Sequence, residues 1–179
     1  MTYTLPQAVI LGIFQLLIVA AALQDATRLR ISNLFPIAIV AAFVAWVAVV
    51  GLEAAIWRNL LGFILCFAAG LFLFSRNWLG GGDVKLLAAI ALWFDLAGTG
   101  RMLLFIAMGG GLLALAIMIV RRMIPLPLAE GSGWAVLRRR GPIPYGVAIA
   151  AGALLAVQLV GVSPRPLSPL EQLNRLMPL

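Results

Sequence analysis

Apolar residues are arranged along this chain in six long runs separated by short polar segments. The runs lie near residues 5–23, 36–52, 57–74, 84–98, 102–120 and 144–162. Most of them approach the roughly 20 residues that an α-helix needs to cross ~30 Å of hydrocarbon. The pattern therefore predicts an all-α, polytopic membrane fold with six transmembrane helices, in a single integral-membrane domain over residues 1–179.

The composition also indicates a membrane protein. The chain is 64% hydrophobic and only 11% charged, whereas about 25% of the residues in a soluble domain are charged. A cleavable signal peptide is an alternative for residues 1–23, because Ala20, Ala21 and Ala22 resemble a cleavage site. A positively charged start is missing and five further apolar runs follow, so we expect the first run to stay as a span.

Basic residues are concentrated in three of the segments between the runs. These segments hold nine of the 13 Lys and Arg residues: Arg28, Arg30, Arg76, Lys85, Arg121, Arg122, Arg138, Arg139 and Arg140. By the positive-inside rule, the three segments face the cytoplasm and both termini face outward. Residues 121–143 are predicted to form a basic cytoplasmic loop beside anionic lipids, which accounts for the net charge without a nucleic-acid partner.

Missing residue types exclude several kinds of catalysis. The chain has no histidine, which excludes His-ligated zinc hydrolysis, the Ser-His-Asp triad and the Cys-His pair. Its one cysteine, Cys66, lies in the middle of the third run, so we expect core packing and neither a Cys-rich zinc site nor an internal disulfide. Lys85 is the only lysine. A Ser-Lys dyad with Ser32 or Ser75 therefore stays open as an alternative.

Six carboxylates remain as candidates, and an ionisable group near a membrane is costly unless it has a role. Three of them fall outside the runs and are expected to be solvated: Glu53, Glu130 and Glu171. Asp95 lies near the outer end of the fourth run beside Trp93 and Phe94, which indicates an interfacial position rather than chemistry. Asp25 and Asp83 are the two candidates that remain.

Asp25 and Asp83 occupy unusual positions at the ends of two runs. Asp25 directly follows the first run, at a helix C-terminus where the macrodipole opposes a negative charge. Asp83 follows Gly80, Gly81 and Gly82 and begins the fourth helix, where an N-cap is an ordinary explanation. The glycines are expected to form a loop that turns tightly and lets a substrate strand approach closely.

The two aspartates are predicted to lie on the same membrane face at similar depth. The fourth run, residues 84–98, is only about 22 Å long as a helix, which keeps Asp83 near the membrane surface. Two adjacent carboxylates share one proton, so one can activate a water molecule while the other polarises the scissile carbonyl. This chemistry requires no metal and no organic cofactor. In the alternative class, a scaffold or transporter, Asp25 and Asp83 are merely a helix-end charge and an N-cap.

Three motifs, in this order, resemble those of the type IV prepilin peptidases, which are GxGD aspartyl peptidases. The resemblance is to the short TadV/CpaA-like members found in Flp pilus systems. The motifs are Asp25 followed by a basic stretch and Ile31-Ser32-Asn33, then Gly80-Gly81-Gly82-Asp83 with Val84-Lys85-Leu86, then Pro144-Tyr145-Gly146. Ser32 replaces the proline of the family, which we expect to loosen the turn without loss of activity.

The resemblance implies an aspartic-type endopeptidase of the bacterial inner membrane that removes the short leader from Flp or type IV pilin-like prepilins. It implies the following site: a catalytic pair Asp25 and Asp83, an active-site loop of Gly80, Gly81 and Gly82, and the supporting neighbours Asn33 and Lys85. The cysteine-bearing insertion of longer members is missing, so methylation is not expected. Another substrate, such as an archaeal preflagellin or a signal-peptide remnant, stays open, as does the oligomeric state.

Overall fold

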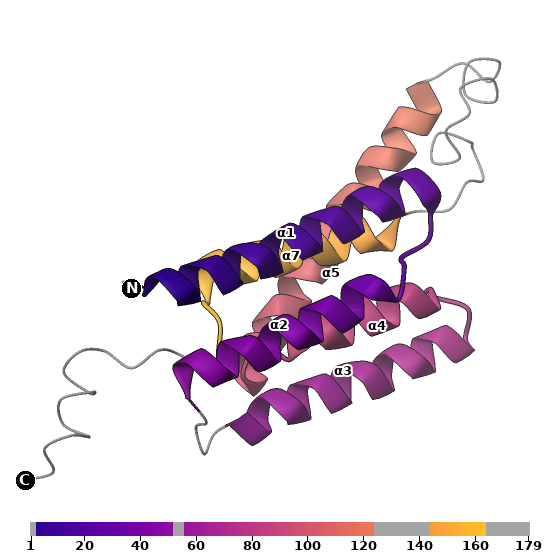
Figure 1. Cartoon of the computed structure of the whole chain (residues 1–179). Helices are drawn as coiled ribbons and strands as arrows, with labels where there is room; N and C mark the ends of the chain where they lie inside the picture. Colours follow the sequence, from indigo (N-terminus) through magenta and orange to yellow (C-terminus); the bar gives the residue numbers. More distant parts are fainter. Residues whose placement is uncertain (1–2, 52–55, 124–143, 164–179) are drawn as a thin grey trace, which may run out of the picture.

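The structure is a computed structural model that describes residues 3–51, 56–123 and 144–163, which form α-helices and no strand (Figure 1). The helices are α1 (Leu5–Arg28), α2 (Leu34–Val50), α3 (Trp57–Ser75), α4 (Gly81–Ala91), α5 (Leu96–Met123) and α7 (Tyr145–Leu159). The all-α prediction is confirmed for these residues. The predicted single domain and the solvated positions of Glu53, Glu130 and Glu171 extend beyond the described ranges and stay predictions.

Three of the helices are long and apolar enough to cross a membrane. They are α1, α3 and the stretch Leu96–Val120 of α5. The apolar helices α2 and α7 are shorter, and α4, with 11 residues, measures only about 16 Å. The chain is therefore an all-helical membrane protein, and the count of six spans stays a prediction.

The short helix α4 lies at the centre of the bundle. It packs against α2, α3 and α7, and Figure 1 shows α2, α3 and α4 in one group beside α1, α5 and α7. Every α4 residue from Leu86 to Ala91 is buried, as is Val84. Gly70 of α3 permits this packing, because a Cβ at that position would lie 2.7 Å from a methyl group of Val84. The core thus fixes the first turn of α4 relative to its neighbours.

The predicted fourth span over residues 84–98 is wrong at its outer end. The helix stops at Ala91, and α5 begins five residues later at Leu96. Asp95 makes this break stable, because its Oδ1 accepts the Gly98 N–H at 2.7 Å and so caps α5. Trp93 and Phe94 are almost completely buried rather than interfacial. Asp95 is therefore a helix cap.

An aromatic cluster holds the end of the bundle that lies opposite the start of α4. Trp93 stacks on Phe14 with ring centroids 3.9 Å apart, and its indole N–H donates to the Ile39 carbonyl at 3.3 Å. Buried Asn59 donates to the carbonyls of Leu92 and Ser163, both at 2.9 Å. These contacts tie α1, α2, α3 and the end of α7 to the residues after α4. Cys66 is buried, as the sequence predicted.

The predicted basic loop 121–143 begins later than expected. Residues 121–123 belong to the last turn of α5, and residues 124–143 lie outside the described ranges. The loop and its cytoplasmic position therefore stay predictions.

Candidate active site

Asp25 lies in the last turn of α1 and is 5% exposed. Its Oδ2 accepts the backbone N–H of Gly146 at 2.8 Å. Gly146 is in the first turn of α7, whose unpaired amides and positive dipole end stabilise a negative group. The N-terminus of α7 therefore compensates for the unfavourable position of this carboxylate at the C-terminus of α1.

Asp83 lies in the first turn of α4, three residues after the N-cap Gly80. Its Oδ1 atom is fully buried and has no hydrogen-bond partner within the described part of the chain. Burial is the main factor that raises the pKa of the Asp83 carboxyl to about 6, and the neighbouring Asp25 carboxyl raises this pKa as well. The Gly80 backbone N–H acts in the opposite direction. The protonated form of Asp83 is thus favoured relative to an exposed aspartate.

The two carboxyl groups face one cavity. The cavity has a volume of about 730 Å³ and is lined by Asp25 and Asp83 together with Leu29, Phe74, Asn77, Trp78, Leu79, Gly80 and Tyr145. It lies where α1 ends and α4 and α7 begin. The sequence interpretation placed both aspartates at one end of the bundle, and the structure brings them together there. The arrangement provides two interacting carboxyl groups beside one open cavity.

The three glycines before Asp83 do not form the expected loop. Gly80 is an extended N-cap, and Gly81 and Gly82 are already helical. None of them has a positive φ angle, so a tight turn is not the reason for glycine here. A Cβ on Gly80 would lie 2.8 Å from Asp83 Oδ2, and a Cβ on Gly82 would lie 3.1 Å from the Ile31 Cβ. Glycine is required at these positions because the chain packs closely around the Asp83 carboxyl and against the α1–α2 turn.

The α1–α2 turn carries the Ile31-Ser32-Asn33 motif past the start of α4. Leu29 adopts a left-handed conformation with φ 51°, which ends α1. The Ser32 N–H donates to the Gln24 side-chain oxygen at 2.6 Å. A proline at position 32 has no N–H and cannot make this bond. Ser32 therefore fixes the turn through a hydrogen bond that a proline could not form, rather than loosening it as the sequence predicted.

Asn33 and Lys85 lie together, but away from the aspartates. The Lys85 ammonium donates to Asn33 Oδ1 at 2.9 Å. Lys85 follows Asp83 by two residues, about 200° around the helix axis, so the two side chains leave α4 on opposite sides. Both Asn33 and Lys85 line a second cavity of about 450 Å³. The structure therefore places Asn33 and Lys85 together at this second cavity and not beside the carboxyl pair.

Three further residues at or beside the cavity were not singled out as site residues from the sequence. Gly146 was quoted only as part of a motif, yet it holds Asp25 directly. Tyr145 and Trp78 line the cavity and are 45% and 69% exposed. Trp78 precedes the glycine run by two positions and gave no signal, because a single aromatic residue at a helix end is equally typical of a membrane interface.

Metal ligands are not clustered near the carboxyl pair. Within residues 3–51, 56–123 and 144–163, no three His, Cys, Asp or Glu side chains lie close enough to hold a metal ion.

The structure thus combines helices long enough to cross a membrane with two carboxyl groups that face one cavity. The model of the type IV leader peptidase family matches residues 10–120, which is more than half of the chain. The chain belongs to this family, and membership supports a peptidase activity. Asp25, Asp83 and the glycines lie inside the matched region, whereas Gly146 lies outside it. Neither a characterised protein nor a solved structure is similar enough to add to this assignment.

Proposed function

We propose that this protein is an aspartic-type endopeptidase of the GxGD class that removes the leader peptide from prepilins. The observation that carries the proposal is the shared cavity, where Asp25 and Asp83 approach from different helices. Family membership supports prepilins as the substrate class. The proposed substrates are Flp or type IV pilin-like prepilins, and the proposed relatives are the short TadV/CpaA-like enzymes.

The two carboxyl groups divide the work of peptide hydrolysis. The Gly146 N–H holds Asp25 Oδ2 in place, and Asp25 is assigned the role of the base that takes a proton from water. Asp83, whose raised pKa favours the acid form relative to an exposed aspartate, donates in that form to the scissile carbonyl oxygen. The water oxygen then adds to the carbonyl carbon, and the C–N bond breaks as a carboxyl proton passes to the departing amine. The attacking water supplies the proton that Asp25 takes up, and the two carboxyl groups relay it to the departing amine.

The proposed location is the bacterial inner membrane, with the site at the cytoplasmic face and both termini outside. The exposed cations Arg28, Arg30 and Arg76 lie at the end of the bundle where Asp25 and Asp83 are found. The positive-inside rule assigns this end to the cytoplasm. Prepilin leaders are cleaved just before an apolar helix, and this placement puts such a bond at the membrane surface beside the carboxyl pair.

Co-expression with candidate prepilins tests the proposal. We expect mass spectrometry to find a prepilin whose new N-terminus directly precedes its apolar helix, in cells with the intact enzyme only. Unchanged N-termini for every prepilin of the host genome, with the enzyme present in the membrane, would count against prepilin cleavage. A new N-terminus in another membrane protein would redirect the assignment to a different substrate of the same chemistry.

The pH dependence of cleavage should follow the protonation of Asp83. Its pKa is raised to about 6, so the acid form is lost as the pH rises through that value. We expect kcat/KM to fall about tenfold per pH unit well above this pKa, because the protonated carboxyl is required. Assays with one peptide substrate from about pH 5 to about pH 9 measure this. An unchanged rate up to the alkaline end would contradict the role of Asp83 as the acid.

Replacing Lys85 by Arg separates the carboxyl mechanism from a Ser-Lys dyad. Within the described residues, Lys85 bonds to Asn33, and neither Ser32 nor Ser75 bonds to it. A dyad needs an amine that can lose its proton, which a guanidinium cannot do. We expect Lys85→Arg to keep more than about a third of the wild-type kcat/KM, a change below 1 kcal/mol. Complete loss of cleavage would favour the dyad.

A further inference from the structure

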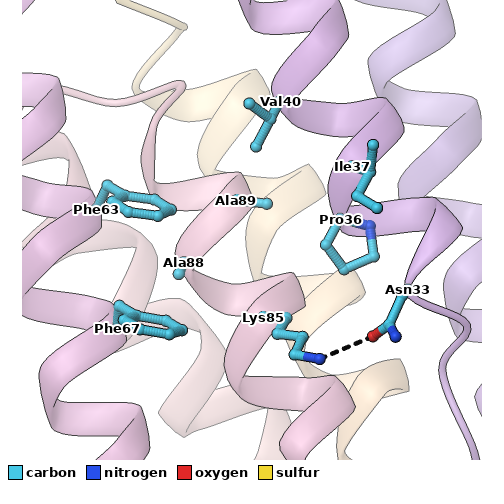
Figure 2. A pocket seen from close by; sticks show the side chains of 9 residues that line it. All are labelled: Asn33, Pro36, Ile37, Val40, Phe63, Phe67, Lys85, Ala88 and Ala89. Carbon is cyan, nitrogen blue, oxygen red and sulfur yellow. Dashed lines mark hydrogen bonds between the residues drawn. The ribbon is translucent and has the colours of Figure 1, made fainter.

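An apolar groove runs along the face of the bundle between α2 and α3. Its walls are Ile37 and Val40 from α2 and Phe63 and Phe67 from α3, and small residues such as Ala88 of α4 form its floor (Figure 2). Its volume is about 450 Å³. The groove is separate from the cavity that the carboxyl pair faces, and the proposed peptidase chemistry does not use it.

One end of this groove is polar and carries a positive charge. Lys85 and Asn33 lie at that end, and their hydrogen bond of 2.9 Å fixes the ammonium group at the groove mouth (Figure 2). Asn33 contributes a neutral acceptor, so the charge of Lys85 is not cancelled. No carboxylate pairs with Lys85 among the residues that the structure describes. A ligand with an anion joined to an apolar chain fits this shape and charge.

The charged end lies at the same level as the cationic surface of the bundle. Lys85 is two residues from Asp83, and exposed Arg28 and Arg30 lie near the adjoining α1–α2 turn. Basic pockets between helices at the cytoplasmic surface are typical sites for anionic lipid headgroups. From this end the groove continues along apolar side chains of α2 and α3. A phospholipid therefore matches both the charge and the direction of the groove.

We propose that the α2–α3 groove binds one anionic phospholipid, with its phosphate beside Lys85 and an acyl chain between Ile37 and Phe67. The lipid fastens α2 and α3 to the first turn of α4, the turn that carries Asp83. This interaction is independent of peptide cleavage and is measured on the whole purified protein.

Lipid binding and thermal unfolding in neutral detergent test the proposal. Dioleoylphosphatidylglycerol and dioleoylphosphatidylcholine carry the same acyl chains and differ in net charge. We expect the wild type to bind the anionic lipid more tightly, in native mass spectrometry titrations, and to show a larger rise in Tm with it. Soluble glycerol phosphate, which lacks the acyl chains, should give no such rise. An equal response to both lipids, or a full response to glycerol phosphate, overturns the proposal.

Substitutions at the two ends of the groove separate charge from shape. Lys85→Gln keeps a donor for Asn33 and should weaken binding of the anionic lipid about fivefold, equal to about 1 kcal/mol. It should affect phosphatidylcholine less, because the choline already offsets the charge of that lipid's phosphate. Lys85→Arg should retain the preference. Ile37→Phe fills the groove from an exposed wall position and should weaken both lipids. Arg76→Gln, which removes an exposed cation outside the groove, is the matched control and should behave as wild type.

Three results contradict the proposal. The first is unchanged lipid preference in Lys85→Gln, and the second is an equal loss in the Arg76→Gln control. The third is an Ile37→Phe protein that binds both lipids normally but has a raised KM for substrate in lipid-free detergent. That result would assign the groove to the apolar helix of the substrate. If Lys85→Gln fails to fold, the wild-type comparison of lipids and the Ile37→Phe protein still decide the question.

Discussion

Replacing Asp83 by Asn should abolish leader cleavage and leave the helical bundle intact. The amide has nearly the same shape but cannot pass a proton to the carbonyl oxygen or the leaving amine. General acid–base catalysis contributes about 100- to 10,000-fold per group, so we expect a loss of at least about a thousandfold in kcat/KM. Asp25→Asn should have a similar effect, because it removes the base. Cleavage of a purified prepilin in detergent measures both.

Asp95→Asn is the matched control for these two substitutions. Asp95 Oδ1 caps α5 through the Gly98 N–H, and asparagine is an equally good N-cap. This variant should keep wild-type activity and stability. Full cleavage by either Asp25→Asn or Asp83→Asn would exclude the carboxyl mechanism. Loss in all three variants, with unfolded protein, would indicate a general sensitivity to charge removal.

The same pair of variants decides between an enzyme and a scaffold or carrier. In a scaffold, Asp83 is only the capping residue of α4, and asparagine at that position would preserve its function. The structure already limits this interpretation, because Asp83 Oδ1 is buried without a partner in the described residues. The Gly80 backbone N–H acts on the same carboxyl, so capping accounts for part of its environment but not for the buried Oδ1. An unpaired buried oxygen costs free energy.

Hydrophobic periodicity predicted the helices better than it predicted their ends. Runs of apolar residues indicate helices that are buried or in lipid. They do not indicate where one helix ends and the next one along the chain begins. The break between α4 and α5 depends on Asp95 and on Trp93, which occupies the core. An aspartate beside two aromatic residues is also typical of the interfacial end of a continuous span. The run 84–98 therefore gave no signal of a break.

The carboxyl pair was predictable because charged residues are rare in this chain. The residues that hold the pair in place were not predictable, because they act through tertiary contacts. Asp25 and Asp83 were identified by elimination and by the motifs around them. The hydrogen bond to Asp25 comes from Gly146, 121 positions along the chain. The contact between Gly82 and Ile31 likewise joins two segments whose proximity no local pattern indicates. Glycine was expected to provide backbone freedom, and the structure shows instead that it provides space.

Replacing Gly146 by Ala should sharply reduce activity by displacing Asp25. A Cβ at this position would lie 2.8 Å from Asp25 Oδ2 and 2.9 Å from both the Asp25 Cβ and the Ile31 Cδ1. Contacts this short with Cβ require a shift of α1 or α7, and the bond from the Gly146 N–H lengthens. A displacement of about 1 Å in a catalytic group costs about 100-fold in rate, which is the loss we expect in kcat/KM.

Two comparisons show whether this loss arises at Asp25. Gly100→Ala is the control for adding a methyl group to a helical glycine, because nothing lies within 4 Å of its Cβ position, and it should keep full activity. The double variant Gly146→Ala with Ile31→Ala removes the flexible neighbour at 2.9 Å but leaves the carboxyl contact. If the carboxyl contact is responsible, the double variant stays as inactive as Gly146→Ala. Recovery of activity would instead assign the effect to packing of the α1–α2 turn, and Asp25 would then not depend on the α7 amide for its position.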